Sequence, residues 1–462
     1  MSSTNSGGLL SSTIEGIKYF HFNIPLYGHT TCASWGDEKI GSRMIPPLWP
    51  SIISSLTPKN HRIDFLYTAF EKVTEKKIGR YDAVGISVPT AAANEAYRIG
   101  DMCRELHIPS IMGGIHAFTL PDEAVQHCDS VLLGEAEYVW SKVLEDLENK
   151  CLKPFYKNKL TEPKDFPTPD LSIYDKYWFY TTNMVETVRG CPCDCEFCGA
   201  TMYSGRRYRY KPLEKMVEEI EKWKRKDRAF FVNTNLAADI KKTKEIMKAI
   251  KDFNLMWWSA CSVNIAEDEE LIKMMSESGC SHLQFGFESI SSKTLKAMNK
   301  PQNIKVNYKK LVRKLHDYNI DVVASFVFGW DTDDESIFKS TLDFALDADI
   351  DVPAYFPLIP FPGTRIFERL KSQNRILTYD WSKYNGAHIV YELKNMTVEK
   401  FAEGLVYCWE ESYSAGNMCR RIMSRWRGVK KTVTSIPIYL LDFATLCLMK
   451  KEYWCFPPIP LL

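Results

Sequence analysis

From residue 184 to residue 358, short apolar runs alternate with amphipathic segments in a regular order. The runs are rich in the β-branched and aromatic residues that strands favour, and they cover residues 184–189, 228–233, 256–262, 282–287, 321–329 and 351–358. The segments between them place apolar side chains three and four positions apart, which is the period of a helix. Six strand–helix units of this kind predict a partial (β/α)6 TIM-like barrel, whose chemistry belongs at the carboxyl ends of the strands.

A similar alternation covers the first part of the chain. Apolar runs at residues 17–22, 62–67, 82–88, 109–112 and 129–133 are separated by helical patterns such as residues 94–106 and 137–148. This order predicts a doubly wound, Rossmann-like parallel sheet that binds its ligand at the carboxyl ends of the strands. The expected fold class is therefore α/β in both parts.

These patterns divide the chain into four parts. We expect a sheet domain at residues 1–155, a polar, proline-bearing linker at 156–180, the barrel at 181–375 and a mostly helical region at 376–462. The last region contains Trp409, Trp426, Tyr439 and a basic run from Arg420 to Lys431, and we expect it to cover the active site. A solvated helix face, a membrane-surface contact and a substrate contact all remain open for it.

Charge and hydropathy exclude several classes of partner. The 462 residues carry 59 Lys and Arg against 58 Asp and Glu, a balance that argues against nucleic acid as the main partner. We find no secretory signal at the start, and no run approaches the ~20 apolar residues of a membrane-spanning helix. The expectation is a cytoplasmic protein without a transmembrane segment.

Four of the 14 cysteines lie within residues 189–200, in the sequence RGCPCDCEFCGA, just after the first barrel strand. Cys191, Cys195 and Cys198 have the spacing C-x3-C-x2-C, and Cys193 between them is expected to be a bystander. A structural zinc site normally needs four ligands, and a [4Fe-4S] cluster also normally takes four cysteines. Three thiolates leave one iron without a protein ligand, so that a substrate or cosubstrate can bind the cluster directly.

At this loop the chain resembles the radical S-adenosylmethionine (SAM) enzymes, which carry this spacing with an aromatic residue before the last cysteine, here Phe197. The resemblance implies that the open iron binds SAM and that reductive cleavage of SAM yields a 5′-deoxyadenosyl radical. It also implies SAM contacts at the strand ends, from Asn233, Asn235, Glu288, Ser289 and Phe328 in addition to Phe197. The chain lacks the family's Gly-Gly-Glu segment at Asn233, and ordinary turn or capping roles for these polar residues stay open.

The glycine-rich turns of the first domain resemble the cobalamin-binding domain that precedes many radical SAM barrels. Three segments carry this resemblance: YDAVGISVPT, IPSIMGGIHAFTLPDEAV and LLGEAE. The resemblance implies cobalamin contacts from Ser87, Thr90, Gly113, Gly114, His116, Gly134 and Glu135. Because the D-x-H-x-x-G motif is absent, we expect base-off cobalamin without a histidine lower ligand, and His116 only as a pocket residue.

The resulting expectation is a cobalamin-dependent radical SAM methyltransferase that alkylates an unactivated carbon under anaerobic conditions. A flavodoxin-type or ferredoxin-type electron donor is the expected partner, and a peptide, a lipid and a small metabolite remain possible substrates. Three alternatives stay open: a non-methylating rearrangement or cyclisation, a radical enzyme whose sheet domain binds no cobalamin, and a non-catalytic iron–sulfur protein.

Overall fold

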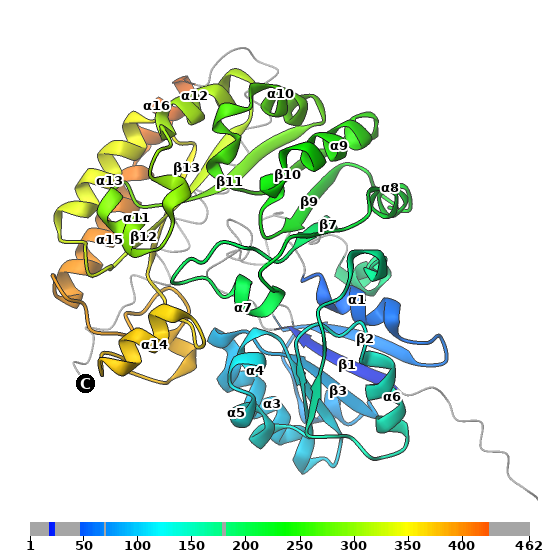
Figure 1. Ribbon diagram of the computed structural model, residues 1–462. Helices are drawn as coiled ribbons and strands as arrows, with labels where there is room; N and C mark the ends of the chain where they lie inside the picture. The colour runs from blue at the N-terminus through cyan, green and yellow to red at the C-terminus, as the bar shows by residue number, and fades with distance from the viewer. Residues whose placement is uncertain (1–17, 24–46, 69–70, 178–181, 425–462) are drawn as a thin grey trace, which may run out of the picture.

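The computed structural model of the protein describes residues 18–23, 47–68, 71–177 and 182–424 (Figure 1). Two parallel sheets form its framework, one in each half of the chain. The first contains β1 (Lys18–Asn23), β2 (Arg62–Tyr67), β3 (Ala83–Ser87), β4 (Ser110–Gly113), β5 (Ser130–Leu133) and β6 (Phe155–Lys157). Its strand order, β2-β1-β3-β4-β5-β6, confirms the expected doubly wound sheet.

Helices cover both faces of this sheet, and alternate strand residues account for the two layers (Figure 1). Val84 and Ile86 are buried with α3 (Ala93–Glu105), whereas Ala83 is buried with Trp140 of α6 (Trp140–Glu148). The remaining helices are α1 (Trp49–Leu56), α2 (Glu75–Ile78), α4 (Ile115–Thr119) and α5 (Pro121–Ala124). Burial on both faces explains why these strands read as continuous apolar runs.

The second sheet confirms the partial barrel. Six parallel strands follow one another in chain order: β7 (Asn183–Arg189), β9 (Arg228–Asn233), β10 (Met256–Cys261), β11 (Cys280–Glu288), β12 (Asp321–Phe328) and β13 (Val352–Pro357). A short antiparallel strand, β8 (Arg209–Tyr210), is paired with β7 at one edge, and β13 forms the other edge. The sheet therefore remains an open half-barrel.

An outer layer of helices covers the convex face of the half-barrel (Figure 1). The layer contains α8 (Leu213–Glu221), α9 (Ile240–Ile250), α10 (Glu269–Glu277), α12 (Tyr308–Asp317), α13 (Ser336–Asp347) and α15 (Val398–Ser412). The shorter elements are α7 (Ala200–Ser204), α11 (Ser292–Ala297), α14 (Arg365–Ser372) and α16 (Ala415–Ser424). No helix among the described residues is long and apolar enough to cross a membrane.

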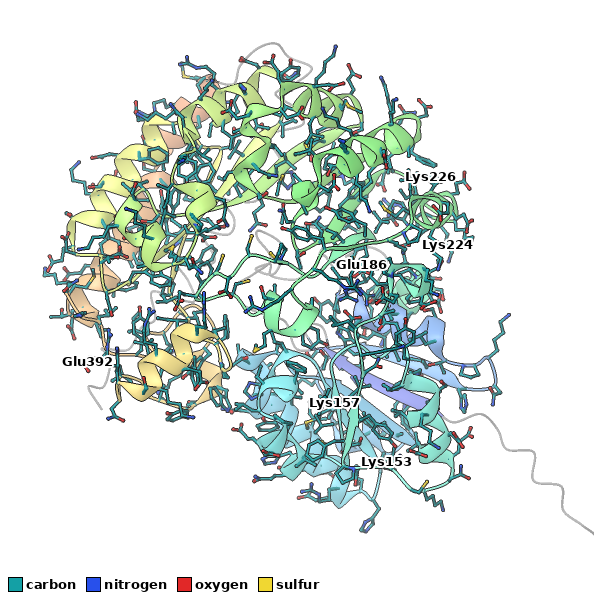
Figure 2. All side chains as sticks on the ribbon, viewed as in Figure 1. Lys153, Lys157, Glu186, Lys224, Lys226 and Glu392 are labelled. Atoms are coloured by element: carbon teal, nitrogen blue, oxygen red, sulfur yellow. The ribbon has the colours of Figure 1, made fainter. Side chains whose placement is uncertain are left out.

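The segment expected as a linker is packed between the two sheets. Its first two residues, the second of which is Lys157, belong to β6 (Figure 2), and Thr161 and Phe166 are fully buried. A 3-10 helix, Leu171–Tyr177, buries Tyr174 and Tyr177 against Phe65 of the first sheet and Met184 of the barrel. The apolar residues hidden in this polar stretch therefore hold the two halves together, while the domain limits themselves stay predictions.

The region after α14 makes two different contacts. Asn94 of α3 donates a hydrogen bond to Asp380, and Trp381 donates one to Glu123, so residues 376–391 join the barrel to the first domain. Trp409 of α15 donates to the carbonyl of Tyr355 and packs on the outer side of the barrel. Trp426, Tyr439 and most of the basic run lie outside the described residues.

Replacing Leu283 by alanine tests the barrel core. Leu283 is fully buried between β11 and the helices, so Leu283→Ala should lower the free energy of unfolding by about 2–5 kcal/mol. Leu377, which is 59% exposed, is the matched control, and Leu377→Ala should stay within about 0.5 kcal/mol of the wild type. Denaturant unfolding measures both, and equal effects would contradict the described packing.

Candidate functional site

The cysteine loop leaves β7 through a glycine that no other residue could replace without strain. Gly190 has φ 78°, and a Cβ on it would lie 2.1 Å from the carbonyl oxygen of Arg207. The hydroxyl of Thr201 in α7 donates to the carbonyls of Cys191 (3.1 Å) and Cys193 (2.8 Å). The loop is thus fixed at both ends, at the carboxyl edge of the barrel.

The three predicted cluster cysteines share one electrostatic environment. A hydrogen bond from Cys193, together with one from Tyr208, lowers the pKa of Cys191 to about 6, whereas burial raises the pKa of Cys195 to about 11 and also raises that of Cys198. The charge of Lys300 acts on all three thiols and favours their thiolate forms. Lys300 follows α11 without any motif that would single it out, so it could not be predicted from the sequence.

This donor set fits an iron–sulfur cluster better than a single metal ion. No three Cys, His, Asp or Glu side chains in the described part of the chain surround one metal-sized point. Each cysteine of a cluster binds a different iron atom, so its thiols need not converge as closely as the ligands of one ion. Three thiols on one loop beside a lysine therefore match a [4Fe-4S] cluster with one iron left open.

The predicted SAM residues at the end of β9 are placed next to this loop. Asn235 lies 3.4 Å from the hydroxyl of Tyr208, which in turn lies 3.9 Å from the sulfur of Cys191. Asn233 donates to Ser259 at 2.5 Å, and its Oδ1 has no hydrogen-bond partner among the described residues. Asn233 therefore retains an acceptor for a ligand, while Asn235 also accepts from the backbone of Ser262.

Glu288 stands at a strained position close to the thiols. Its φ is 63°, which a glutamate adopts rarely, and its carboxylate accepts a hydrogen bond from Lys300 at 2.5 Å. Ser289 accepts from the backbone of Ser291, which is a turn role. The pair of Glu288 and Lys300 thus places one negative and one positive group beside the cluster loop.

The two aromatic residues predicted to contact SAM lie in different surroundings. Phe197 on the loop packs edge-to-face on Trp330, with 6.0 Å between the ring centroids. Phe328 is buried in the outer layer, stacked on Tyr355 at 5.9 Å and against Phe338 at 4.8 Å. A SAM contact by residue 328 would have to come from its backbone.

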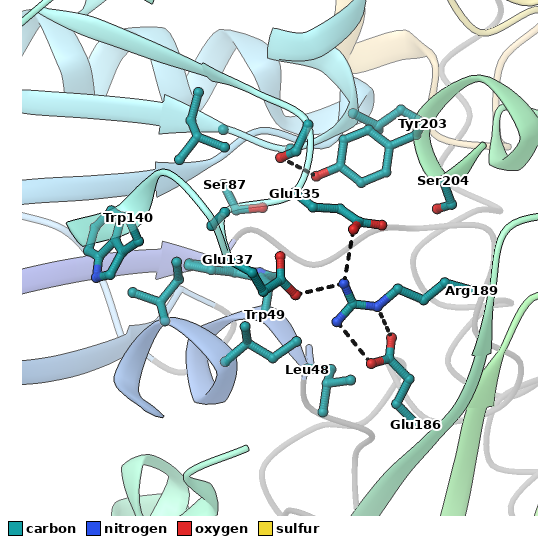
Figure 3. A pocket seen from close by; sticks show the side chains of 18 of the residues that line it. Leu48, Trp49, Ser87, Glu135, Glu137, Trp140, Glu186, Arg189, Tyr203 and Ser204 are labelled. Atoms are coloured by element: carbon teal, nitrogen blue, oxygen red, sulfur yellow. Dashed lines mark hydrogen bonds and ion pairs between the residues drawn. The ribbon is translucent and has the colours of Figure 1, made fainter. Parts of the chain in front are cut away.

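A cavity of about 440 Å³ lies between the first sheet and the barrel (Figure 3). Five of the predicted cobalamin residues line it: Ser87, Gly113, Gly114, Gly134 and Glu135. The barrel contributes residues from β7, α7 and the end of β9, namely Glu186, Val188, Arg189, Tyr203, Ser204, Val232, Asn233 and Thr234. Gly114 has φ 95°, and a Cβ there would lie 3.0 Å from the backbone nitrogen of Val88, so this turn has no room for a side chain.

Thr90 and His116, the other two predicted cobalamin residues, do not line this cavity. Both are buried, and the ring of His116 lies 3.3 Å from the Thr90 hydroxyl and 3.0 Å from the hydroxyl of Tyr97. The ring also packs against Trp381. His116 thus joins the first domain to the barrel's carboxyl-terminal extension, and its role towards cobalamin stays a prediction.

Charged groups form a network at one end of the cavity (Figure 3). Arg189 donates to both carboxylate oxygens of Glu186 (2.7 and 2.9 Å) and to Glu137 (2.6 Å), and it lies 3.3 Å from Glu135. Burial opposes ionisation of Glu135, but the hydrogen bond from Arg209 and the charge of Arg189 outweigh it and lower the pKa. Arg189 lies two residues before Cys191, and this closeness to the cysteine motif is the one sequence signal that could have indicated it.

Replacing Arg189 by methionine should leave buried carboxylates without their shared cation. We expect Arg189→Met to lower the free energy of unfolding by about 3–5 kcal/mol at pH 7. The unpaired carboxylates should have raised pKa values in the folded state, so they bind protons on acidification and the deficit should narrow between pH 7 and pH 5.

Denaturant unfolding across this pH range measures the effect. Arg206→Met is the control, because Arg206 is 67% exposed and pairs with Asp194 at the surface, where such pairs contribute about 0–1 kcal/mol. A deficit that stays constant with pH would contradict the assignment of these carboxylates as ionised partners of Arg189.

Comparison with known proteins agrees with this site. Residues 185–345 match the family model of the radical SAM superfamily. The chain is 31% identical over 390 residues to bacteriochlorophyllide d C-12(1)-methyltransferase of Chlorobaculum tepidum, covering 82% of this chain and 85% of that protein. It is 25% identical over 435 residues to the anaerobic magnesium-protoporphyrin IX monomethyl ester cyclase of Cereibacter sphaeroides, covering 84% of this chain and 70% of that protein.

A solved structure shows the same two-part architecture. The cobalamin-dependent S-adenosylmethionine radical enzyme OxsB, with aqua-cobalamin bound, superposes with a TM-score of 0.65 over 95% of this chain and 73% of that chain, at 15% identity. This likeness concerns the fold alone, while the relative at 31% identity extends through both halves of the chain. The chain therefore belongs to the radical SAM enzymes, in the family that contains this C-methyltransferase.

Proposed function

We propose that this protein methylates an unactivated carbon of a magnesium tetrapyrrole. The observation that carries the proposal is the cavity shared by the two sheets. It joins the glycine turns at Gly113, Gly114 and Gly134 to β7, the strand that leads directly into the cysteine loop. A methyl donor bound on the first sheet would therefore lie beside the strand that carries the cluster loop.

Cys191, Cys195 and Cys198 would hold the cluster, and Asn233 and Glu288 are the groups best placed to orient SAM. The carboxylate of Glu288 would accept hydrogen bonds from SAM, and the free Oδ1 of Asn233 would accept one more. Bound there, the cluster and SAM supply the 5′-deoxyadenosyl radical that abstracts hydrogen, and cobalamin supplies the methyl group. Lys300 holds Glu288 in place and keeps the local charge favourable for three thiolates.

The first sheet would hold cobalamin without a histidine on cobalt. None of the described residues that line the cavity is a histidine, and both ring nitrogens of His116 already lie within hydrogen-bond distance of other groups. Glycines at the strand ends leave space for the corrin ring against the backbone. This arrangement supports binding without a histidine ligand, and we propose the base-off form in addition.

The reaction also needs an external one-electron donor, and we propose a flavodoxin-type or ferredoxin-type protein. Arg206, Arg207 and Arg365 are exposed around the cysteine loop. Each is paired with a carboxylate of Asp194 or Glu162, and these surface pairs could exchange for pairs with the charged groups of a docking donor. Nucleic acid is not proposed as a partner, because the net charge of the chain is only +1.

The substrate class follows from the relatives together with the interior of the barrel. The names of the two relatives above specify tetrapyrroles, and one specifies magnesium. The concave face of the half-barrel carries aromatic side chains at Phe230 and Trp258, which could stack on a large planar ring, together with the polar Gln284. Because one of these relatives is a cyclase, ring formation on the same substrate class is the second candidate function.

An anaerobic assay on cluster-reconstituted, cobalamin-loaded protein tests the proposal. With SAM, a low-potential reductant and chlorophyllide a, the wild type should form 5′-deoxyadenosine and S-adenosylhomocysteine, and mass spectrometry should show a pigment heavier by one CH2 unit. Cys198→Ala should lose 5′-deoxyadenosine formation, because the cluster loses one of its three thiolates.

Cys193→Ala is the matched control on the same loop. Cys193 lies between the predicted ligands, so its removal should retain cluster content and product formation. Deoxyadenosine without S-adenosylhomocysteine would favour cyclisation over methylation. If protein with an intact cluster forms neither 5′-deoxyadenosine nor S-adenosylhomocysteine, the proposed activity is overturned.

A further inference from the structure

The concave face of the half-barrel has an aromatic row across three neighbouring strands. Phe230 of β9, Trp258 of β10 and His282 of β11 are paired in register and are each partly exposed. Phe230 and Trp258 have ring centroids 5.9 Å apart, while Trp258 and His282 are stacked at 5.4 Å with 19° between their planes. Their neighbours Phe231, Trp257 and Leu283 are fully buried on the opposite, helix-covered face.

Smaller side chains line the same face between this aromatic row and the cysteine loop. Ala260, Gly286 and Ser325 are partly exposed there, on three adjacent strands. Alternation along a strand places every second residue on one face, so these residues share the concave side with Trp258 and His282. Gln284, which is paired with Ala260, is the larger side chain on this face and is also partly exposed.

The two ring nitrogens of His282 differ in their surroundings. Nδ1 lies 3.0 Å from the hydroxyl of Ser281, and that hydroxyl donates to the carbonyl of Trp257 at 3.1 Å. The Ser281 proton is thus used, so Nδ1 is the donor to Ser281 and the lone pair belongs to Nε2. Within the part of the chain that the structure describes, no side chain or backbone group is a hydrogen-bond partner of Nε2.

Burial also keeps this imidazole uncharged. It lowers the pKa of His282 to about 4, and the carboxylate of Asp351 only partly offsets the effect. A neutral imidazole with one nitrogen fixed by a hydrogen bond is the form in which histidine binds metals. No catalytic step described above uses this residue.

We infer that Nε2 of His282 is the axial ligand of the magnesium ion in a tetrapyrrole bound within the half-barrel, with the macrocycle beside Trp258. The inference rests on the proposed function, because it needs a magnesium tetrapyrrole as substrate. The four ring nitrogens of such a substrate leave the metal an axial position, which a neutral imidazole fills. His282 would thereby position the macrocycle without touching the reacting carbon.

The depth of His282 is compatible with this role. Six residues separate His282 from Glu288 on the same strand, about 20 Å of extended chain. That length leaves space for a macrocycle between the aromatic row and SAM at the strand ends. Ala260, Gln284 and Gly286 lie in this interval.

Binding of a matched pair of pigments to the cobalamin-loaded, cluster-containing enzyme tests the inference. Chlorophyllide a contains magnesium, and pheophorbide a is its metal-free counterpart. By anaerobic absorbance titration, the wild type should bind chlorophyllide a about tenfold or more tightly than pheophorbide a. His282→Ala should bind both pigments with similar affinity, and added imidazole should restore the preference in His282→Gly.

Two further variants keep the result interpretable. Ser325→Ala changes a neighbouring concave residue and should retain the preference for the magnesium pigment. If His282→Ala does not fold by circular dichroism, His282→Leu replaces it, because leucine keeps most of the bulk but has no atom that can bind magnesium. Resonance Raman spectra should show five-coordinate magnesium in the wild type and loss of its imidazole ligand in either variant.

The outcomes separate this inference from the proposed function. A pigment that is methylated but bound without metal preference, or a preference that survives in His282→Ala, would overturn axial ligation alone. If the wild type binds and methylates neither pigment, the proposed substrate class fails, and the assignment of His282 falls with it.

Discussion

Arg189 connects the two halves of this protein at the place where their chemistry must meet. It is the last residue of β7, so the cysteine loop begins one residue later, and its guanidinium binds Glu186 within the barrel and Glu137 from the first domain. Below it, the ring of Phe166 lies 4.3 Å from the guanidinium carbon. Removing a buried arginine that binds several carboxylates is strongly destabilising, because the carboxylates are left buried without a cation. It therefore fixes the carboxyl ends of the two sheets facing one another across the cavity.

The strands and helices of both sheets could be predicted because each leaves a periodic pattern of apolar residues in the local sequence. All six parallel barrel strands occur where apolar runs predict them, and β6 was missed because three residues, Phe155 to Lys157, carry almost no periodic signal. The cysteine spacing predicted the cluster loop for the same reason: its ligands are close in sequence. Contacts between segments that are far apart in the chain could not be predicted, and the packed linker shows why. Thr161 and Phe166 read as parts of a polar loop, yet each is fully buried against partners some 40 residues further along the chain.

The site residues likewise fall into those whose placement the local sequence predicts and those whose placement depends on distant segments. Ser87, Gly113, Gly114, Gly134 and Glu135 share one cavity because strand ends of a parallel sheet share an edge. His116 follows the same glycines but turns away into α4, where Tyr97 and Trp381 surround it. Phe328 likewise ends a strand yet faces the helices, because side chains alternate between faces and a motif does not specify which face a residue takes. Lys300 and Tyr208 were missed because their roles depend on loops whose paths no local pattern records.

The junction between the cysteine loop and the barrel interior depends on the absence of a side chain. A Cβ at Gly286 would lie 2.1 Å from the carboxylate of Glu288 and 2.8 Å from the ammonium of Lys300. These two charged groups therefore occupy the space above Gly286, and Lys300 also donates to its carbonyl at 2.9 Å. Above them are the thiols, whose thiolate forms a nearby cation favours. Below them are Ala260 and Trp258 together with the polar side chains of Gln284 and His282. The Gly-Phe-Glu-Ser segment thus has a steric explanation: residue 286 must be small so that one ion pair fits between the cluster loop and the barrel interior.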